Sequence, residues 1–63
     1  MAARLLGTRV IPGNTLPYRG VRFVKSLPDG RRVYYQESTR MWLRVQATAS
    51  QLVVEEWFGG CGC

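Results

Sequence analysis

The turn sequence Leu-Pro-Asp-Gly at residues 27–30 constrains the fold more than any other feature of the chain. Proline presets φ at the first corner of such a turn, and glycine takes the left-handed conformation that closes it. The flanking segments 21–26 and 31–38 alternate in polarity and are rich in β-branched and aromatic residues. Together these features predict a β-hairpin.

Three further segments have the composition of short strands. Residues 40–47 follow a second turn at residues 38–39, residues 51–58 contain two consecutive valines and two aromatic residues, and residues 4–11 offer a first strand. No segment shows a helical period. We therefore expect an all-β fold, either a small antiparallel meander or a five-stranded barrel-like domain. The segment 13–20 is expected to be a loop or an arm that reaches a neighbour.

The chain has 63 residues, which is enough for one domain. We assign residues 1–58 to a single β domain, with a partly irregular arm at residues 1–20, and residues 59–63 to a flexible Gly/Cys tail. Domains of this size bury only about 60% of the surface of the unfolded chain, so docking or oligomerisation often stabilises them. No apolar run is long enough to span a membrane.

Positive charge is concentrated in the first 44 residues of the chain. Nine Lys and Arg residues stand against four acids, and all nine precede residue 45. Such a charge attracts polyanions, including nucleic acid and acidic protein surfaces. Eight of the nine are arginine, whose planar guanidinium stacks on rings and forms paired hydrogen bonds with phosphate.

Period-two alternation sorts the side chains of the three central segments onto two faces. One face is expected to form the core, and its members are Val21, Phe23, Val33, Tyr35, Met41, Leu43 and Val45. The opposite face is expected to be exposed, and it interleaves arginine with aromatic residues. Its members are Arg22, Arg32, Tyr34, Arg40, Trp42 and Arg44.

This exposed Arg–aromatic face is the candidate binding site. Aromatic rings stack on bases, which contributes roughly 1–3 kcal/mol per base, and Trp, Tyr and Arg are enriched in protein-binding hot spots. A structural interpretation stays open, in which other segments cover Trp42 or cation–π contacts only stabilise the sheet. We expect a binding and assembly subunit that docks onto a larger protein or nucleoprotein assembly. Binding of RNA or single-stranded DNA by the same face is the alternative.

The residues of known catalytic and metal sites are scarce. The chain has no histidine, the commonest general base and metal ligand near neutral pH. Glu55 and Glu56 are adjacent, so they are expected to point to opposite faces of a strand. No glycine-rich phosphate loop or nucleophile motif is present. We therefore expect no enzymatic activity, no metal site and no cofactor.

Both cysteines lie in the last three residues. Cys61 and Cys63 are too close for an easy internal disulfide, so we expect them to act, if at all, as inter-chain thiols in a homo-oligomer. Their confinement to the tail favours a reducing intracellular compartment. Two arginines near the N-terminus leave mitochondrial targeting as an alternative.

Residues 16–42 resemble a WW domain at several points. Leu-Pro-Tyr-Arg-Gly-Val at residues 16–21, Asp-Gly-Arg-Arg-Val-Tyr-Tyr at residues 29–35 and Ser-Thr-Arg-Met-Trp at residues 38–42 carry the resemblance. It implies that Tyr35 and Trp42 form a groove for a proline-rich peptide, which gives a third possible function.

Overall fold

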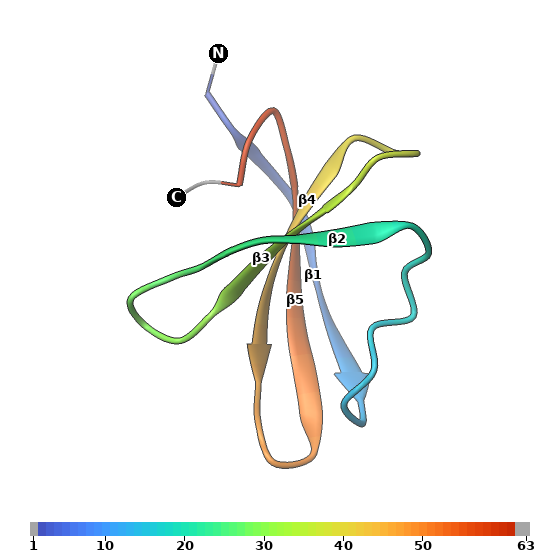
Figure 1. Ribbon diagram of the computed structural model, residues 1–63, viewed down its shortest axis with the longest axis vertical. Helices are drawn as coiled ribbons and strands as arrows, with labels where there is room; N and C mark the ends of the chain where they lie inside the picture. The colour runs from blue at the N-terminus through green and yellow to red at the C-terminus, as the bar shows by residue number, and fades with distance from the viewer. Residues whose placement is uncertain (1, 62–63) are drawn as a thin grey trace.

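All five strands belong to one antiparallel sheet in the computed structural model, which describes residues 2–61. The strands are β1 (Arg4–Pro12), β2 (Val21–Ser26), β3 (Arg32–Gln36), β4 (Met41–Ala47) and β5 (Gln51–Phe58). Their order across the sheet is β1-β5-β4-β3-β2, so β1 and β2 are its two edges (Figure 1). The predicted all-β fold is confirmed, and the sheet stays open instead of closing into a barrel.

The turn at residues 27–30 has the geometry that its sequence predicts. The amide of Leu27 donates to the carbonyl oxygen of Arg31 at 2.7 Å, and the amide of Gly30 donates to that of Leu27 at 3.0 Å. Gly30 has a φ of 93°, a left-handed conformation that glycine adopts without steric cost. The hairpin of β2 and β3 is therefore confirmed.

The segment 13–20 crosses one face of the sheet. It joins β1 to β2, the opposite edges, and Figure 1 shows it running from the end of β1 to the start of β2. Leu16 and Tyr18 of this segment pack against the buried cluster formed by β4 and β5. Within the predicted arm, residues 4–12 are a regular strand and residues 13–20 cover the core.

Two polar contacts hold this crossing segment in place, and a third orients Gln36, which makes one of them. The hydroxyl of Tyr18 donates to Oε2 of Glu56 at 2.6 Å, and Nε2 of Gln36 donates to the carbonyl oxygen of Arg19 at 2.8 Å. Oε1 of the buried Gln36 accepts from the hydroxyl of Thr39 at 2.6 Å. Burial and the hydrogen bond to Glu56 raise the pKa of Tyr18 to about 12. The crossing segment is thus tied to both β3 and β5.

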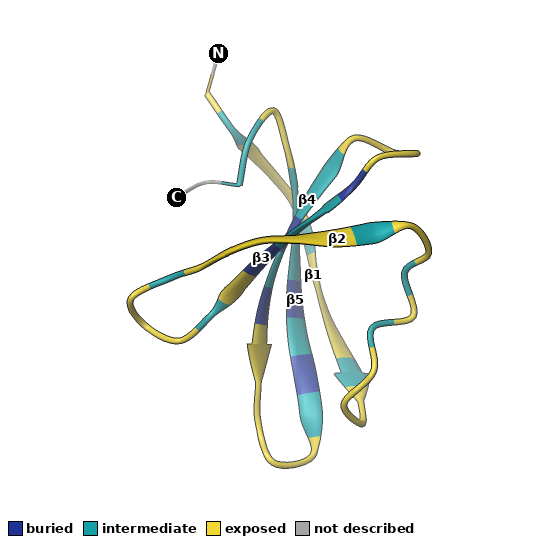
Figure 2. Ribbon diagram, in the orientation of Figure 1, coloured by how far each residue is buried: buried dark blue, intermediate teal, exposed yellow. Residues whose placement is uncertain are grey.

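Buried side chains are confined to the three central strands, as Figure 2 shows. The edge strands are mostly exposed because each has a neighbour on one side only. Within residues 2–61 there is no helix, and so none long and apolar enough to cross a membrane. The buried apolar residues are Val33, Leu43, Val45, Leu52 and Val54.

The register of β3 and β4 corrects the predicted faces. Tyr35 pairs with Trp42 and Tyr34 pairs with Leu43, and paired residues project from the same side of a sheet. Tyr35 was expected beside Leu43 and Tyr34 beside Trp42, so the assignment of β3 was wrong.

We name the two sides of the sheet by one β4 residue on each. The Trp42 face carries Arg22, Lys25, Val33, Tyr35, Trp42, Arg44, Glu55 and Trp57, and the Leu43 face carries Val21, Phe23, Arg32, Tyr34, Leu43, Val45, Val54 and Glu56.

The length of one loop explains this correction. Gln36 pairs with Met41, so four residues, 37–40, connect the two strands. A loop one residue longer or shorter would exchange the faces of β3 relative to β4. Phe23 does lie on the predicted face, but it is 55% exposed because β2 is an edge strand.

Candidate functional site

A row of side chains crosses the Trp42 face, one from each strand. Arg22 pairs with Tyr35, Tyr35 with Trp42, Trp42 with Trp57, and Trp57 with Leu5. We call these five residues the aromatic row. Its three rings are half-buried, and Leu5 is 46% exposed. The row therefore joins all five strands and still presents part of its surface to solvent.

Close contacts within the row limit the free faces of its rings. The centroids of Tyr35 and Trp42 are 4.7 Å apart at an angle of 50°. The guanidinium carbon of Arg22 lies 5.6 Å from the centroid of Tyr35, and that of Arg44 lies 4.6 Å from the ring of Trp57. Such cation–π contacts contribute on the order of 0.5–1 kcal/mol at exposed sites. The row is thus a set of cross-strand contacts as well as a surface.

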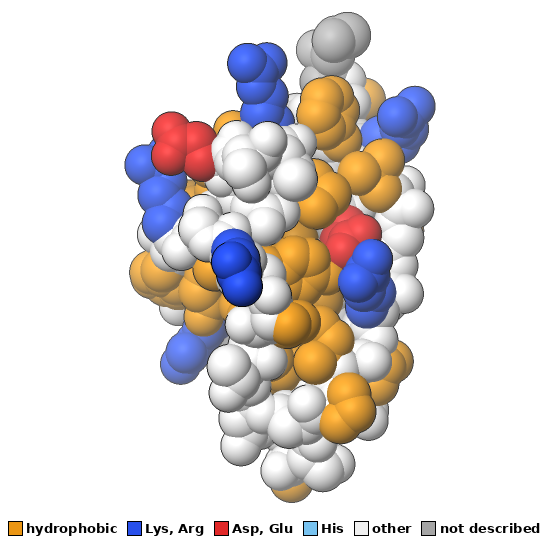
Figure 3. Space-filling view, turned by 90° about the vertical axis from the view of Figure 1, so that its right-hand side faces the viewer, with side chains coloured by type: hydrophobic (Ala, Val, Ile, Leu, Met, Phe, Trp, Pro, Cys, Tyr) orange, Lys and Arg blue, Asp and Glu red, His pale blue; other side chains and the backbone are white. Residues whose placement is uncertain are grey.

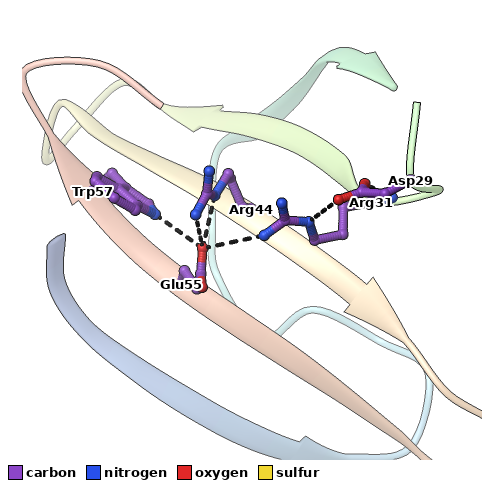
Figure 4. A network of polar contacts seen from close by, with 5 residues as sticks. All are labelled: Asp29, Arg31, Arg44, Glu55 and Trp57. Atoms are coloured by element: carbon purple, nitrogen blue, oxygen red, sulfur yellow. Dashed lines mark hydrogen bonds and ion pairs between the residues drawn. The ribbon is translucent and has the colours of Figure 1, made fainter. Parts of the chain in front are cut away.

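Glu55 organises a polar network next to the row (Figure 4). Its Oε1 accepts hydrogen bonds from Nε of Arg44 at 2.7 Å and from Nε1 of Trp57 at 3.2 Å. The same oxygen lies 3.6 Å from Nη1 of Arg31, whose Nε is 2.8 Å from Oδ2 of Asp29. One carboxylate therefore fixes two arginines and a tryptophan.

The ionisation of Glu55 follows from these partners. Burial raises the pKa of its carboxyl, but the hydrogen bonds from Arg44 and Trp57 and the nearby positive charges outweigh burial, and the pKa is lowered from 4.5. Glu55 stays ionised and compensates the charge of Arg44, whose side chain is only 13% exposed. Arg44 therefore positions the ring of Trp57 and is a poor candidate for binding phosphate.

Most of the other cations are not compensated in this way. Ion pairs among residues 2–61 engage only three cations, Arg9, Arg31 and Arg44. Two of the others lie together on the Trp42 face of β2, because a bulge between Phe23 and Lys25 brings Lys25 opposite Val33. The β2 end of the aromatic row is thus basic. The six cations without an ion pair in this part of the chain are Arg4, Arg19, Arg22, Lys25, Arg32 and Arg40.

The Leu43 face carries a half-open groove of about 600 Å³. Arg32 and Tyr34, both predicted to lie beside Trp42, line this groove together with Val45 and Leu52. Figure 3 shows the side that bears the crossing segment, where hydrophobic side chains gather in the middle and Lys and Arg side chains project around them. The predicted Arg–aromatic face is therefore divided between the two sides of the sheet.

Two further predicted positions lie outside both faces. Arg40 belongs to the turn between β3 and β4 and has a φ of 57°. Cys61 is the last described residue, and its sulfur is engaged in a disulfide. Cys63 lies outside the described residues, so the inter-chain role expected for the two cysteines stays a prediction.

The acids are arranged for pairing with arginine. Glu55 and Glu56 point to opposite faces, as predicted, because they pair with Arg44 and Leu43 respectively. Oε2 of Glu56 lies 3.3 Å from Nε of Arg9. No cluster of three or more His, Cys, Asp or Glu side chains suited to a metal occurs within residues 2–61.

Three members of the row were not predicted from sequence. Tyr35 was expected in the core, and Trp57 and Leu5 were given no role. Alternation along residues 51–58 puts Glu55 and Trp57 on one side, which was a usable signal. The register that brings Trp57 opposite Trp42 was needed to assign that side.

Comparison with known proteins adds no relative. No protein family, no curated protein and no solved structure matches the chain. The function is therefore inferred from the geometry of the Trp42 face and from its charges.

Proposed function

We propose that the protein is a non-catalytic binding and assembly subunit that docks onto a larger protein or nucleoprotein assembly through its Trp42 face. One observation carries this proposal: the half-exposed aromatic row ends at β2 in Arg22 and Lys25, two exposed cations with no ion pair within residues 2–61. Aromatic residues surrounded by arginine are typical of hot spots in protein interfaces. An acidic protein surface complements this arrangement.

Single-stranded RNA or DNA is the second candidate ligand, favoured by the six cations that lack an ion pair among the described residues. Two observations rank it lower. Guanidinium groups already cover rings of Tyr35 and Trp57, which leaves less surface for a base. Arg32 lies on the opposite face from Arg22, so the cations do not follow one strand-binding track.

A peptide reader similar to a WW domain ranks third. The resemblance places a proline-binding groove at Tyr35 and Trp42. Ring centroids only 4.7 Å apart indicate that the two rings contact each other, with no room for a proline ring between them.

The docking proposal can be tested by changing one ring of the row. Trp42→Leu keeps an apolar side chain but removes the aromatic surface, and Phe58→Leu is the matched control because Phe58 is 46% exposed on the Leu43 face. Both variants should show the circular dichroism spectrum of the wild type. In affinity capture from the source cell after nuclease treatment, we expect proteins bound by the wild type and by Phe58→Leu to be lost from Trp42→Leu.

Two results would refute the docking proposal. One is the capture of the same proteins by folded Trp42→Leu, and the other is the loss of every partner on nuclease treatment of the wild type. After the second result, titration with a fluorescent oligothymidine tests whether the protein binds nucleic acid directly. The logarithm of a nucleic-acid binding constant falls linearly with the logarithm of salt concentration. Binding should also quench the fluorescence of the row's tryptophans if bases stack on them.

A further inference from the structure

We infer that the free edge of β2 accepts an extended segment of a partner protein in which acidic and apolar residues alternate. This inference builds on the proposed docking function and names the form of the partner. It concerns the exposed edge strand Val21–Ser26 and not the middle of the aromatic row. Addition of a strand to a free sheet edge is a common mode of peptide recognition, in which backbone hydrogen bonds supply affinity and alternate side chains supply specificity.

The edge of β2 is open to such a strand. β3 is its sole neighbour in the sheet, and within residues 2–61 the backbone contacts of the crossing segment are to other strands and turns: Gly13 donates to Ser50, and the carbonyl oxygen of Arg19 accepts from Gln36. Phe23 and Val24 are 55% and 40% exposed. Exposed apolar residues on a free edge strand favour association with another chain.

The Trp42 side of this edge is basic, so it complements acidic residues of a partner strand. Arg22 and Lys25 both project there, because the extra residue in the bulge at Val24 puts Lys25 on the same side of the strand as Arg22. Neither has an ion pair within residues 2–61. A strand added beside β2 would place every second side chain next to these two cations, so acidic residues suit those positions.

The Leu43 side of the same edge is apolar, so it complements apolar residues of a partner strand. Phe23 projects there and contacts Tyr34 edge-on, with ring centroids 5.7 Å apart. Val21 lies on the same side and packs against the buried cluster. The alternate side chains of an added strand would extend this apolar surface. The two sides together specify an alternating acidic and apolar sequence.

The same charges exclude a second copy of β2 as the occupant. Antiparallel pairing of two β2 strands would set Arg22 and Lys25 of one chain near the same cations of the other, and like charges in register are destabilising. The opposite edge, β1, lacks this specificity. It has a single cation without an ion pair within residues 2–61, Arg4 at its start, because Arg9 is paired with Glu56, and its exposed Leu5 and Val10 carry no charge.

A designed peptide tests the inference. The probe is a fluorescein-labelled peptide with four alternating Glu-Val repeats, and its control has the same composition in two blocks. At low salt the protein should bind the alternating peptide more tightly than the block peptide. The double variant Arg22→Glu with Lys25→Glu should bind the alternating peptide at least about tenfold more weakly, and it should bind a Lys-Val peptide better than the wild type does.

Two controls separate strand addition from a general effect of charge. Arg4→Glu with Arg40→Glu changes the net charge equally and should leave the affinity for the alternating peptide within about twofold. Hydrogen exchange of amides in residues 21–26 should slow when the alternating peptide binds. Equal binding of both peptides, equal weakening by the two double variants, or unchanged exchange at β2 would overturn the inference.

The two proposals fail in different ways. If the peptide does not bind but Trp42→Leu still loses the captured proteins, strand addition at β2 is refuted and docking through the aromatic row stands. If captured proteins are indifferent to Trp42→Leu but the peptide protects β2, the edge is an acceptor and the row is only structural.

Discussion

At the scale of single residues, the partly exposed carboxylate of Glu55 contacts three side chains, those of Arg31, Arg44 and Trp57. Replacing it by glutamine keeps the shape of the side chain but removes the charge that compensates Arg44 and Arg31. Because hydrogen bonds between charged groups are worth more than neutral ones, Glu55→Gln should lower the free energy of unfolding by about 1–2 kcal/mol. Urea unfolding followed by tryptophan fluorescence measures this change.

The matched control for Glu55 is Glu37→Gln. Glu37 is exposed and has no ion pair within residues 2–61, so its replacement should change the free energy of unfolding by less than about 0.5 kcal/mol. Equal effects of the two substitutions would show that the network in Figure 4 does not stabilise the fold.

Glu55 also makes stability depend on pH. Its pKa in the folded protein is lowered from 4.5, so its stabilisation is present above that value and is lost as the pH falls through the lowered pKa. The difference in stability between the wild type and Glu55→Gln should therefore shrink in acid. Urea titrations at several pH values below neutrality measure it, and a difference that stays constant through the acid range would contradict the assignment.

Arg40 is strained in the turn between β3 and β4. It is the one residue other than glycine with a positive φ among those described, at 57°, and a side chain in that region costs roughly 1–2 kcal/mol. Arg40→Gly relieves the strain but adds entropy to the unfolded chain, so a net gain of about 0.5–1 kcal/mol is expected. Ser38→Gly, in the same turn, should destabilise instead. Thermal unfolding of the three proteins measures both effects.

At the scale of elements, the crossing segment 13–20 holds its place through Tyr18. Tyr18→Phe removes the hydrogen bond to Glu56 and leaves that half-buried carboxylate with Arg9 alone, so we expect a loss of about 1–2 kcal/mol. Tyr34→Phe is the control, since the hydroxyl of Tyr34 has no hydrogen-bond partner among the described side chains.

Titration of Tyr18 gives a second measurement of the same contact. Its pKa is raised from 10.0 to about 12, so its stabilisation is fully present below pH 10 and is lost as the pH rises through about 12. Carbon-13 NMR of the labelled tyrosine ring follows this titration. A midpoint near 10 would mean that the hydrogen bond between the crossing segment and β5 is absent in solution.

The strands themselves could be predicted from sequence, but their faces could not. Alternation and the Pro-Asp-Gly turn placed β2, β3 and β4 within one or two residues. Which side of β3 meets Trp42 depends on whether the loop 37–40 holds four residues or one more or fewer, and turn sequences do not fix that number. The bulge at Val24 has the same effect within β2, where it aligns Arg22 with Lys25.

The route of the crossing segment could not be predicted either. Whether residues 13–20 cover a face depends on where β1 lies in the sheet. β1 pairs with β5, at the other end of the chain, and no local pattern specifies a partner so distant. Once β1 and β2 are opposite edges, the segment between them has to cross the sheet, and Leu16 and Tyr18 become part of the core's cover.

At the scale of the whole molecule, the fold has a small core and two open edges. Buried apolar side chains come from three strands. Most of the large exposed apolar residues of the described part lie on the edge strands, namely Leu5, Leu6, Val10, Phe23 and Val24, and Phe58 at the end of β5 is the exception. A domain of about 60 residues rarely gains more than about 3–5 kcal/mol from one core. The proposed binding surface and the margin of stability are therefore related, because apolar area left at the edges is area that the core does not bury.

Because the core is small, truncating a buried side chain of a central strand should lower the stability far more than truncating an exposed side chain of an edge strand. Leu43 is completely buried, and Leu43→Ala should cost about 3 kcal/mol, which lowers the melting temperature by about 12 °C or more in a domain this small. Leu6→Ala removes the same atoms from a residue 46% exposed on β1 and should shift the melting temperature by only a few degrees. Circular dichroism melts at two protein concentrations distinguish the sources of stability. If Leu43→Ala and Leu6→Ala melted alike, with midpoints that rise with concentration, the edges of the sheet would already be paired between chains and would contribute as much stability as the core.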